Sequence, residues 1–300
     1  MQRFWLGLAL LLAACAPAGG APSGTPGVGP ACPATPLNVV AAENQYGSLA
    51  LQLGGACVRV VSVIAGADVD PHDYQIDART ARAYQDADVI FQNGLGYDPF
   101  SERLVSSLST RPVVVTFGDV VGLRDGDNPH LWYSPDYLTR IIHAMTTAFQ
   151  QARPEAISYF AERAGDLDRA LGPYRDTIAE VRRRHTGTPI GTTETLFVPM
   201  AEATGLSVLT PPRLLDALAE AGQPSVADVT TMQNQIQQRQ IRVLVYNAQT
   251  ERAISRQWAA MAQEAGVPVV TVTETLPSAD ETFQELQVRQ LRALVAALGD

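Results

Sequence analysis

The stretch 37-LNVVAAENQYGSLALQLGGACVRVVSVI-64 indicates the fold. Its first part, Leu37–Ala42, and its last part, Val58–Ile64, are apolar and rich in β-branched residues, which is typical of buried strands. Between them, Tyr46, Leu49 and Leu53 recur at helical spacing. This strand, helix, strand order predicts two parallel strands joined by a crossover helix, in a sheet covered on both faces.

The same alternation continues on both sides of one long amphipathic segment. Apolar residues recur at steps of three and four over residues 154–185, with a kink expected at Gly172-Pro173. A coiled-coil seam is the alternative, but the stripe is short and has few flanking ion pairs. The remaining strands are expected at 87–91, 112–116, 189–193, 207–210, 242–246 and 268–273, and the remaining helices at 77–86, 135–151, 196–204, 225–238, 252–265 and 282–298. We therefore predict an α/β fold of two lobes, each a parallel sheet flanked by helices, joined by one long backbone helix.

The first residues have the pattern of an export signal. Arg3 precedes an unbroken apolar run of 11 residues, Phe4–Ala14, which is shorter than the roughly 20 residues of a membrane-spanning helix. The run ends in Leu12-Ala13-Ala14-Cys15, which resembles a bacterial lipobox, in which the cysteine takes a lipid. Ordinary cleavage beside an incidental cysteine is the alternative.

The chain is accordingly divided into five parts. Residues 15–36 hold five Gly and six Pro, a composition typical of a flexible tether. We expect a signal peptide at 1–14, a lipid-anchored tether at 15–36, an N-terminal α/β lobe at 37–153, a linking helix at 154–186 and a C-terminal α/β lobe at 187–300.

The number of cysteines agrees with an exported protein. Lipidation of Cys15 leaves Cys32 and Cys57, which an oxidising compartment allows to pair, with about 3 kcal/mol of stabilisation for so short a loop. Two separate thiols are the alternative.

The 300 residues are 46% hydrophobic and carry a net charge of −9. This composition indicates a folded protein without the basic surface that nucleic-acid binding requires.

Four expected strand ends carry residues of metal-ligand type. His72 and His130 follow strands of the first lobe, each directly after a proline, and Glu194 and Glu274 end strands of the second. Ligands bind at the carboxyl ends of parallel strands, and two imidazoles with two carboxylates suit a divalent ion. Taken singly, each histidine could be a surface residue and each glutamate a helix N-cap. The other two histidines, His143 and His185, are not expected to be ligands.

Four motifs extend this argument to a family. The sequences DPHDY (70–74), NGLGYDP (93–99), NPHLWYSP (128–135) and TVTETLP (271–277) together resemble the zinc/manganese ABC-transporter solute-binding lipoproteins. The resemblance implies a two-lobed fold with a rigid backbone helix and one divalent ion in the cleft. It carries the four ligands of the family onto His72, His130, Glu194 and Glu274, although relatives commonly have Asp at the last position.

The resemblance implies capture and delivery of a metal rather than catalysis. The expected cargo is one Zn²⁺ or Mn²⁺ ion, and the residues do not decide between them. The expected partners are a membrane ABC permease and a separate cytoplasmic ATPase, since the chain has no P-loop motif. A monomer is expected, held by lipidated Cys15 at the outer face of the bacterial cytoplasmic membrane or in the periplasm. The alternatives are a surface-tethered metal-dependent hydrolase, although no HExxH or GxSxG occurs, and an adhesin-type lipoprotein without a transport role.

Overall fold

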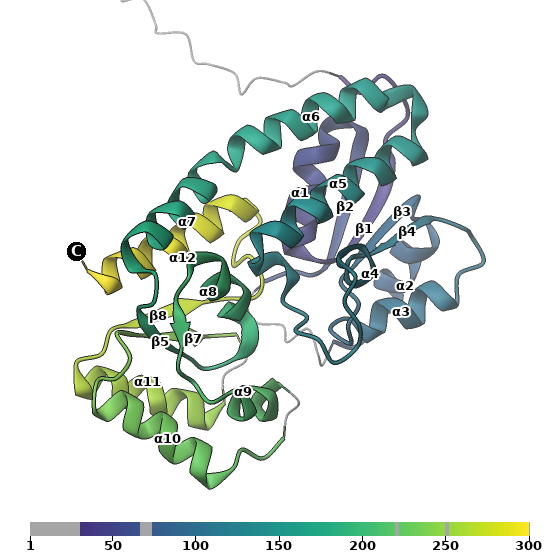
Figure 1. The fold of residues 1–300 in the computed structure, drawn as a ribbon. Helices are drawn as coiled ribbons and strands as arrows, with labels where there is room; N and C mark the ends of the chain where they lie inside the picture. Colours follow the sequence, from purple (N-terminus) through teal and green to yellow (C-terminus); the bar gives the residue numbers. More distant parts are fainter. Residues whose placement is uncertain (1–30, 67–73, 220–221, 250–251, 300) are drawn as a thin grey trace, which may run out of the picture. The chain divides into compact units, whose positions relative to one another are not determined.

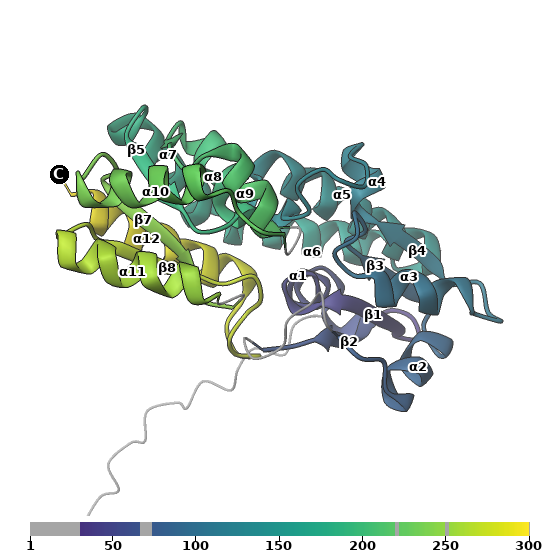
Figure 2. The same ribbon diagram turned by 90° about the horizontal axis from the view of Figure 1, so that it is seen from below.

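The fold is described from a computed structural model that covers residues 31–66, 74–219, 222–249 and 252–299. The described residues form two parallel sheets of four strands each, and helices pack against both sheets (Figures 1 and 2). Both sheets belong to one compact unit, residues 31–300. The predicted α/β class with two sheets flanked by helices is therefore confirmed.

The first sheet has the order β2-β1-β3-β4. Successive side chains of β1, one of its two central strands, point into two different cores. Val39 and Ala41 pack with α1 and α5 on one face, and Val40 and Ala42 face α2 and α3 on the other. This two-residue period is what a strand buried on both sides requires. The elements of this half are β1 (Leu37–Glu43), α1 (Asn44–Gly54), β2 (Val58–Ile64), α2 (Ala78–Gln85), β3 (Val89–Gln92), α3 (Pro99–Ser106), β4 (Val113–Thr116), α4 (Phe117–Val121) and α5 (Pro135–Ala152).

The second sheet repeats the arrangement with the order β6-β5-β7-β8. Val243 and Val245 face the larger core, which also contains Val39 and Ala41 of the first sheet, whereas Leu244 faces a separate core under α9, α10 and α11. One continuous core therefore joins the two halves. The elements here are β5 (Pro189–Thr192), α8 (Val198–Thr204), β6 (Ser207–Val208), α9 (Pro212–Ala219), α10 (Val226–Gln237), β7 (Val243–Asn247), α11 (Ala253–Ala265), β8 (Val269–Val272) and α12 (Phe283–Leu298).

The connection between the halves is two helices rather than one. A short 3₁₀ turn, Pro154–Ala156, leads into α6 (Ile157–Ala170), and α7 (Gly172–His185) follows after Leu171. Pro173 has no N–H to donate to the carbonyl four residues before it, which explains the interruption. In Figure 1, α6 runs beside α1 and α5, and α7 runs beside α12, in agreement with the contacts between these helices.

Helix α1 also binds the segment that follows β8. Asn44 donates to the carbonyl of Leu276 at 2.8 Å and accepts its N–H at 2.9 Å. Four residues further, the hydroxyl of Ser48 accepts the N–H of Phe283, and four residues further again, Gln52 exchanges hydrogen bonds with a side chain of α12. A stripe of α1 thus holds the loop that carries Glu274.

The chain before β1 is attached to the first sheet. Cys32 and Cys57 form a disulfide in the structure, and Arg153 donates to the carbonyl of Thr35 at 2.8 Å. The expected lipidation site Cys15 lies outside the described residues, as do the signal peptide and most of the tether. Within the described ranges, no helix combines the length and apolar character needed to cross a bilayer.

Candidate metal centre

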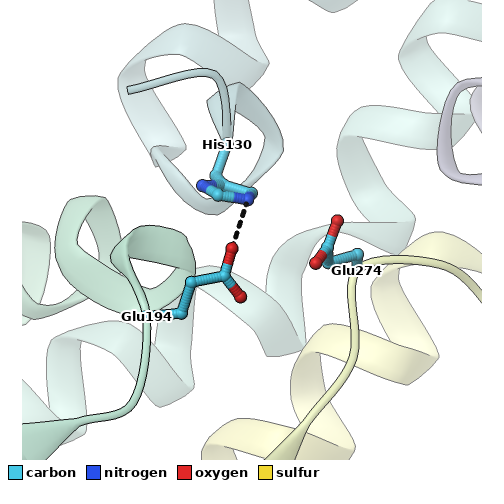
Figure 3. Close-up of side chains that lie close together, drawn as sticks. All are labelled: His130, Glu194 and Glu274. Atoms are coloured by element: carbon cyan, nitrogen blue, oxygen red, sulfur yellow. Dashed lines mark ion pairs between the residues drawn. The ribbon is translucent and has the colours of Figure 1, made fainter. Parts of the chain in front are cut away.

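Three side chains from three separate loops converge at the carboxyl ends of the strands. His130, Glu194 and Glu274 each offer a ligand atom, and these atoms all lie within 4.8 Å of one another (Figure 3). No other cluster of this kind occurs among the residues that the structure describes. The fourth expected ligand, His72, falls in 67–73, outside the described residues.

His130 is presented by a loop that packs against aromatic rings. The loop follows α4, and the His130 ring lies 5.9 Å from Tyr97 and 5.6 Å from Trp132, edge to face with both. The Asn93 amide donates to the carbonyl of Pro129 at 3.0 Å, which fixes the backbone directly before the histidine. The side chain is 2% exposed.

The environment of the His130 ring also selects its tautomer. Nδ1 lies 2.8 Å from Oδ1 of Asn128, whose amide nitrogen donates to the carbonyl of Thr195. Since Oδ1 is therefore an acceptor, the neutral ring carries its proton on Nδ1. Nε2 then presents its lone pair 3.6 Å from Oε1 of Glu194, a distance too long for a hydrogen bond. A neutral imidazole held in this way is the form that binds a metal.

Glu194 and Glu274 stand directly beyond strands of the second sheet. Glu194 follows β5, and Figure 3 shows one of its carboxylate oxygens turned toward His130. Glu274 follows β8 and is fully buried, so it does not line an open cleft. Its Oε2 accepts the hydroxyl of Tyr97 at 2.5 Å. Burial, and next the charge of Glu274, hold the pKa of Tyr97 well above its usual range, so the phenol remains a donor.

Both carboxylates accept hydrogen bonds from the amide of Asn247, which the sequence did not indicate as part of the site. Asn247, the last residue of β7, donates from its side-chain nitrogen to Glu194 and, at 2.8 Å, to Glu274. Gln249 accepts the backbone N–H groups of Glu274 and Thr275 at 3.1 and 3.0 Å. Asn247 comes directly after the strand expected at 242–246, but an amide is neither of the two ligand types, imidazole and carboxylate, that indicate the site in the sequence.

The arrangement suits a divalent cation. Two carboxylates and one imidazole nitrogen meet there, and both groups are ligand types that divalent ions bind. Ligand bonds of about 2.0–2.2 Å place two ligand atoms of one ion at most about 4.4 Å apart, close to the 4.8 Å within which these three side chains offer their atoms. His143 and His185 lie on α5 and α7 and do not belong to the cluster.

Comparison with known proteins assigns the family. The model of the periplasmic zinc-uptake complex component A family, ZnuA, matches residues 39–297. The chain belongs to the ZnuA family. The resemblance noted in the four sequence motifs is thereby confirmed.

Individual relatives of this ZnuA-family chain are distant. The zinc-binding lipoprotein AdcA of Streptococcus pneumoniae is 20% identical over 283 residues, covering 86% of this chain and 55% of AdcA. The manganese-binding lipoprotein MntA of Bacillus subtilis is 23% identical over 143 residues, covering 45% of this chain and 46% of MntA. The chain thus spans about half the length of each of these relatives.

Solved structures share the fold over most of the chain. The periplasmic zinc-binding protein TroA of Treponema pallidum has a TM-score of 0.73 at 19% identity, covering 89% of this chain and 100% of TroA. The manganese-bound periplasmic metal-binding protein of Candidatus Liberibacter asiaticus has a TM-score of 0.72 at 20% identity, with 87% and 99% coverage. These likenesses confirm the two-sheet fold of this ZnuA-family member.

Proposed function

We propose that this protein is an extracytoplasmic solute-binding lipoprotein that captures one divalent transition-metal ion, Zn²⁺ or Mn²⁺, and delivers it to an ABC permease. The observation that supports this most directly is the convergence of His130, Glu194 and Glu274 within 4.8 Å. His72 completes the proposed ligand set. Relatives described as zinc-binding and manganese-binding lipoproteins, AdcA and MntA, support the class of cargo.

The charges of the site agree with a cargo ion. When both carboxylates are ionised they carry −2, which an M²⁺ ion neutralises. Four protein ligands also leave no open position for the water that a catalytic zinc activates. We therefore propose transport rather than hydrolysis, with the ion received by a membrane permease that a separate cytoplasmic ATPase drives.

The remaining parts of the proposal concern where the protein works. We propose cleavage of the signal peptide 1–14, lipidation of Cys15, a tether over 15–36 and action as a monomer beside the membrane. The two lobes, 37–153 and 187–300, would be joined by the helical linker 154–186. A Cys15→Ser variant is expected to leave the membrane fraction, and unchanged retention would contradict lipid anchoring.

Metal titration tests the central claim. Metal-free protein should bind one Zn²⁺ or Mn²⁺ ion per chain by calorimetry, and His72→Ala should weaken binding at least tenfold, about 1.4 kcal/mol. His143→Ala is the matched control, because this histidine is exposed on α5. Absence of stoichiometric binding in the unmodified chain would overturn the proposal.

Two assays separate the proposal from its alternatives. Metal analysis of protein purified from its native host, without added metal, identifies the physiological ion. Loss of metal uptake on deletion of the protein, restored by the unmodified chain, is expected of a transport component and not of an adhesin. Ester or phosphoester turnover by the metal-loaded protein, abolished with the ion, would instead favour the hydrolase.

A further inference from the structure

The loop that carries Glu274 is attached to the first half of the chain as well as to its own sheet. Two residues after Glu274, the buried Leu276 meets Asn44, the first residue of α1. The side-chain amide of Asn44 donates to the carbonyl of Leu276 at 2.8 Å and accepts its N–H at 2.9 Å. Two hydrogen bonds between one amide and one residue fix both the position and the orientation of that residue's backbone.

The chain between Glu274 and this attachment is short and held on both sides. Only Thr275 separates Glu274 from Leu276, and Thr275 is fully buried. Its hydroxyl lies 3.1 Å from the carbonyl of Gly66, which follows β2 in the first half. Consecutive Cα atoms are about 3.8 Å apart and joined by planar peptides. A displacement of Leu276 is therefore passed on to Glu274 across two peptide units.

Further along, the same segment is attached to α1 a second time. Gln284, ten residues after Glu274, exchanges two hydrogen bonds with Gln52, at 3.1 and 2.7 Å. Between the two attachments the segment borders a cavity of about 400 Å³, which residues from 277–282 line together with α1 and the end of β2. In Figure 2 this yellow segment between β8 and α12 lies next to α1. The attachment nearest the metal centre is thus the one made by Asn44.

We propose that Asn44 is a positioning residue of the metal centre, which holds Glu274 in place from the first half of the chain and thereby raises the affinity for the ion. This inference rests on the proposed function, since it requires that the cluster binds an ion. His130 belongs to the same half as Asn44, whereas Glu274 follows a strand of the other half. The Asn44 hydrogen bonds therefore contribute to the separation of these two side chains, and ligands already held in place lose less freedom when an ion binds.

The alternative is that Asn44 only joins the two halves and contributes to stability alone. Gln52 provides the matched control, because it also exchanges two hydrogen bonds with the second half but far from Glu274 in the sequence. Asn44→Leu and Gln52→Met each remove both hydrogen bonds while keeping a side chain of similar size. We expect both variants to lower the melting temperature of the metal-free protein.

The two variants should differ in Zn²⁺ binding, measured by competition with a chromophoric chelator. Asn44→Leu should weaken binding about tenfold, the lower end of the range for residues that support a ligand, and Gln52→Met should leave it unchanged. If Asn44→Leu does not fold, as judged by its metal-free melting curve, Asn44→Ala is measured against the same criteria.

A double-mutant cycle tests whether the effect of Asn44 passes through Glu274. In a Glu274→Ala background the side chain that Asn44 positions is gone, so Asn44→Leu should weaken Zn²⁺ binding by less than about twofold. If Asn44 acts on the whole contact between the halves instead, the loss should be the same in both backgrounds. Should Glu274→Ala not fold, Glu274→Gln is used as the background.

The outcomes separate this inference from the proposed function. If the unmodified chain binds neither Zn²⁺ nor Mn²⁺, the proposed function fails. If it binds an ion and Asn44→Leu weakens Zn²⁺ binding more than threefold, with Gln52→Met and the Glu274→Ala background insensitive, the role of Asn44 is supported. An affinity of Asn44→Leu within threefold of the unmodified value, an equal loss in Gln52→Met, or an undiminished loss in the Glu274→Ala background refutes that role, and the proposed function stands.

Discussion

In the second sheet, Glu194 and Glu274 each come two residues after a strand, beyond Thr192 and Val272, whereas in the first sheet His130 comes 14 residues after Thr116, the end of β4. Both sheets add their strands in the same order. The position of a candidate ligand next to a strand is fixed by the backbone hydrogen bonds of the sheet. A ligand on a long loop depends on side chains such as Asn128 and the surrounding aromatic rings.

The first strands of the two sheets show a second contrast. β1 ends in Glu43, which is fully buried, and β5 leads into Glu194, which belongs to the metal centre. Burial is the main cause that raises the pKa of Glu43 well above its usual range, and the charge of Asp98 adds to it. The same topological position thus holds a carboxylate of the candidate metal centre in one half and a buried acid in the other.

The largest expected effect is loss of the loop-borne ligand itself. His130→Ala removes the Nε2 donor and should weaken Zn²⁺ binding at least about a hundredfold, beyond the 10- to 100-fold range typical of residues that only support a ligand. Calorimetric titration measures it, with His143→Ala as the control. A loss below tenfold would remove His130 from the ligand set.

For a candidate ligand at a strand end, we expect the loss of its negative charge to weaken metal binding. Glu274→Gln removes one negative charge and should weaken metal binding at least tenfold, about 1.4 kcal/mol. The amide is of the same size and can still accept from Asn247, so the free energy of unfolding of the metal-free protein should change by about 1 kcal/mol or less. Titration and metal-free unfolding separate the two quantities. Unchanged affinity with lowered stability would make Glu274 a structural residue.

The side chain that supports the loop-borne ligand should have an effect of about tenfold. Asn128→Ala removes the acceptor of Nδ1 and releases the tautomer of His130, which should weaken metal binding roughly tenfold. Asn128→Asp keeps an oxygen acceptor and should restore most of the affinity. The nitrogen NMR shifts of the His130 ring report the tautomer directly, and an unchanged tautomer in Asn128→Ala would contradict this role.

The buried acid of the first half should affect stability alone, and the effect should depend on pH. Because the pKa of Glu43 is raised in the folded state, the folded protein keeps a proton that the unfolded chain releases above about pH 4.5, so stability falls as pH rises. Glu43→Gln should therefore be more stable than the unmodified protein at pH 7.5, by about 1 kcal/mol, and nearly equal at pH 4.5.

Metal-free denaturant unfolding at the two pH values measures this difference. The pKa of Asp98, which burial raises to about 6, adds to the fall in stability, and because Asp98 interacts with Glu43 the comparison reports on this pair of acids. An advantage of Glu43→Gln that is as large at pH 4.5 as at pH 7.5 would contradict ionisation as its cause.

The sheets could be predicted from the sequence because β-branched runs alternate with helical spacing, as in 37–64. Glu194 and Glu274 could be predicted to meet because the carboxyl ends of parallel strands share an edge of their sheet, and His130 could be predicted to join them because ligands bind beyond the carboxyl ends of the strands in both lobes. Three short helices, α3, α4 and α9, were not predicted, and none of them exceeds eight residues.

Other features depend on tertiary contacts that local patterns do not report. Glu274 was expected to be a ligand in a cleft, but it is completely buried, and it accepts a hydrogen bond from Tyr97, which belongs to the other half of the chain. Asn247 could be placed at a strand end, but its two acceptors are 53 and 27 residues away in the sequence. The single-residue break at Leu171 came close to the kink expected at Gly172-Pro173.

The disulfide between Cys32 and Cys57 decides how the folded unit bears a mechanical load. Cys57 directly precedes β2, and β1 begins shortly after Cys32, with Leu37 paired to Val58 across the two strands. Tension in the chain ahead of Cys32 is therefore divided between the starts of two neighbouring strands. Pulling on one strand therefore also loads the other, and the force enters at the edge opposite the candidate metal centre.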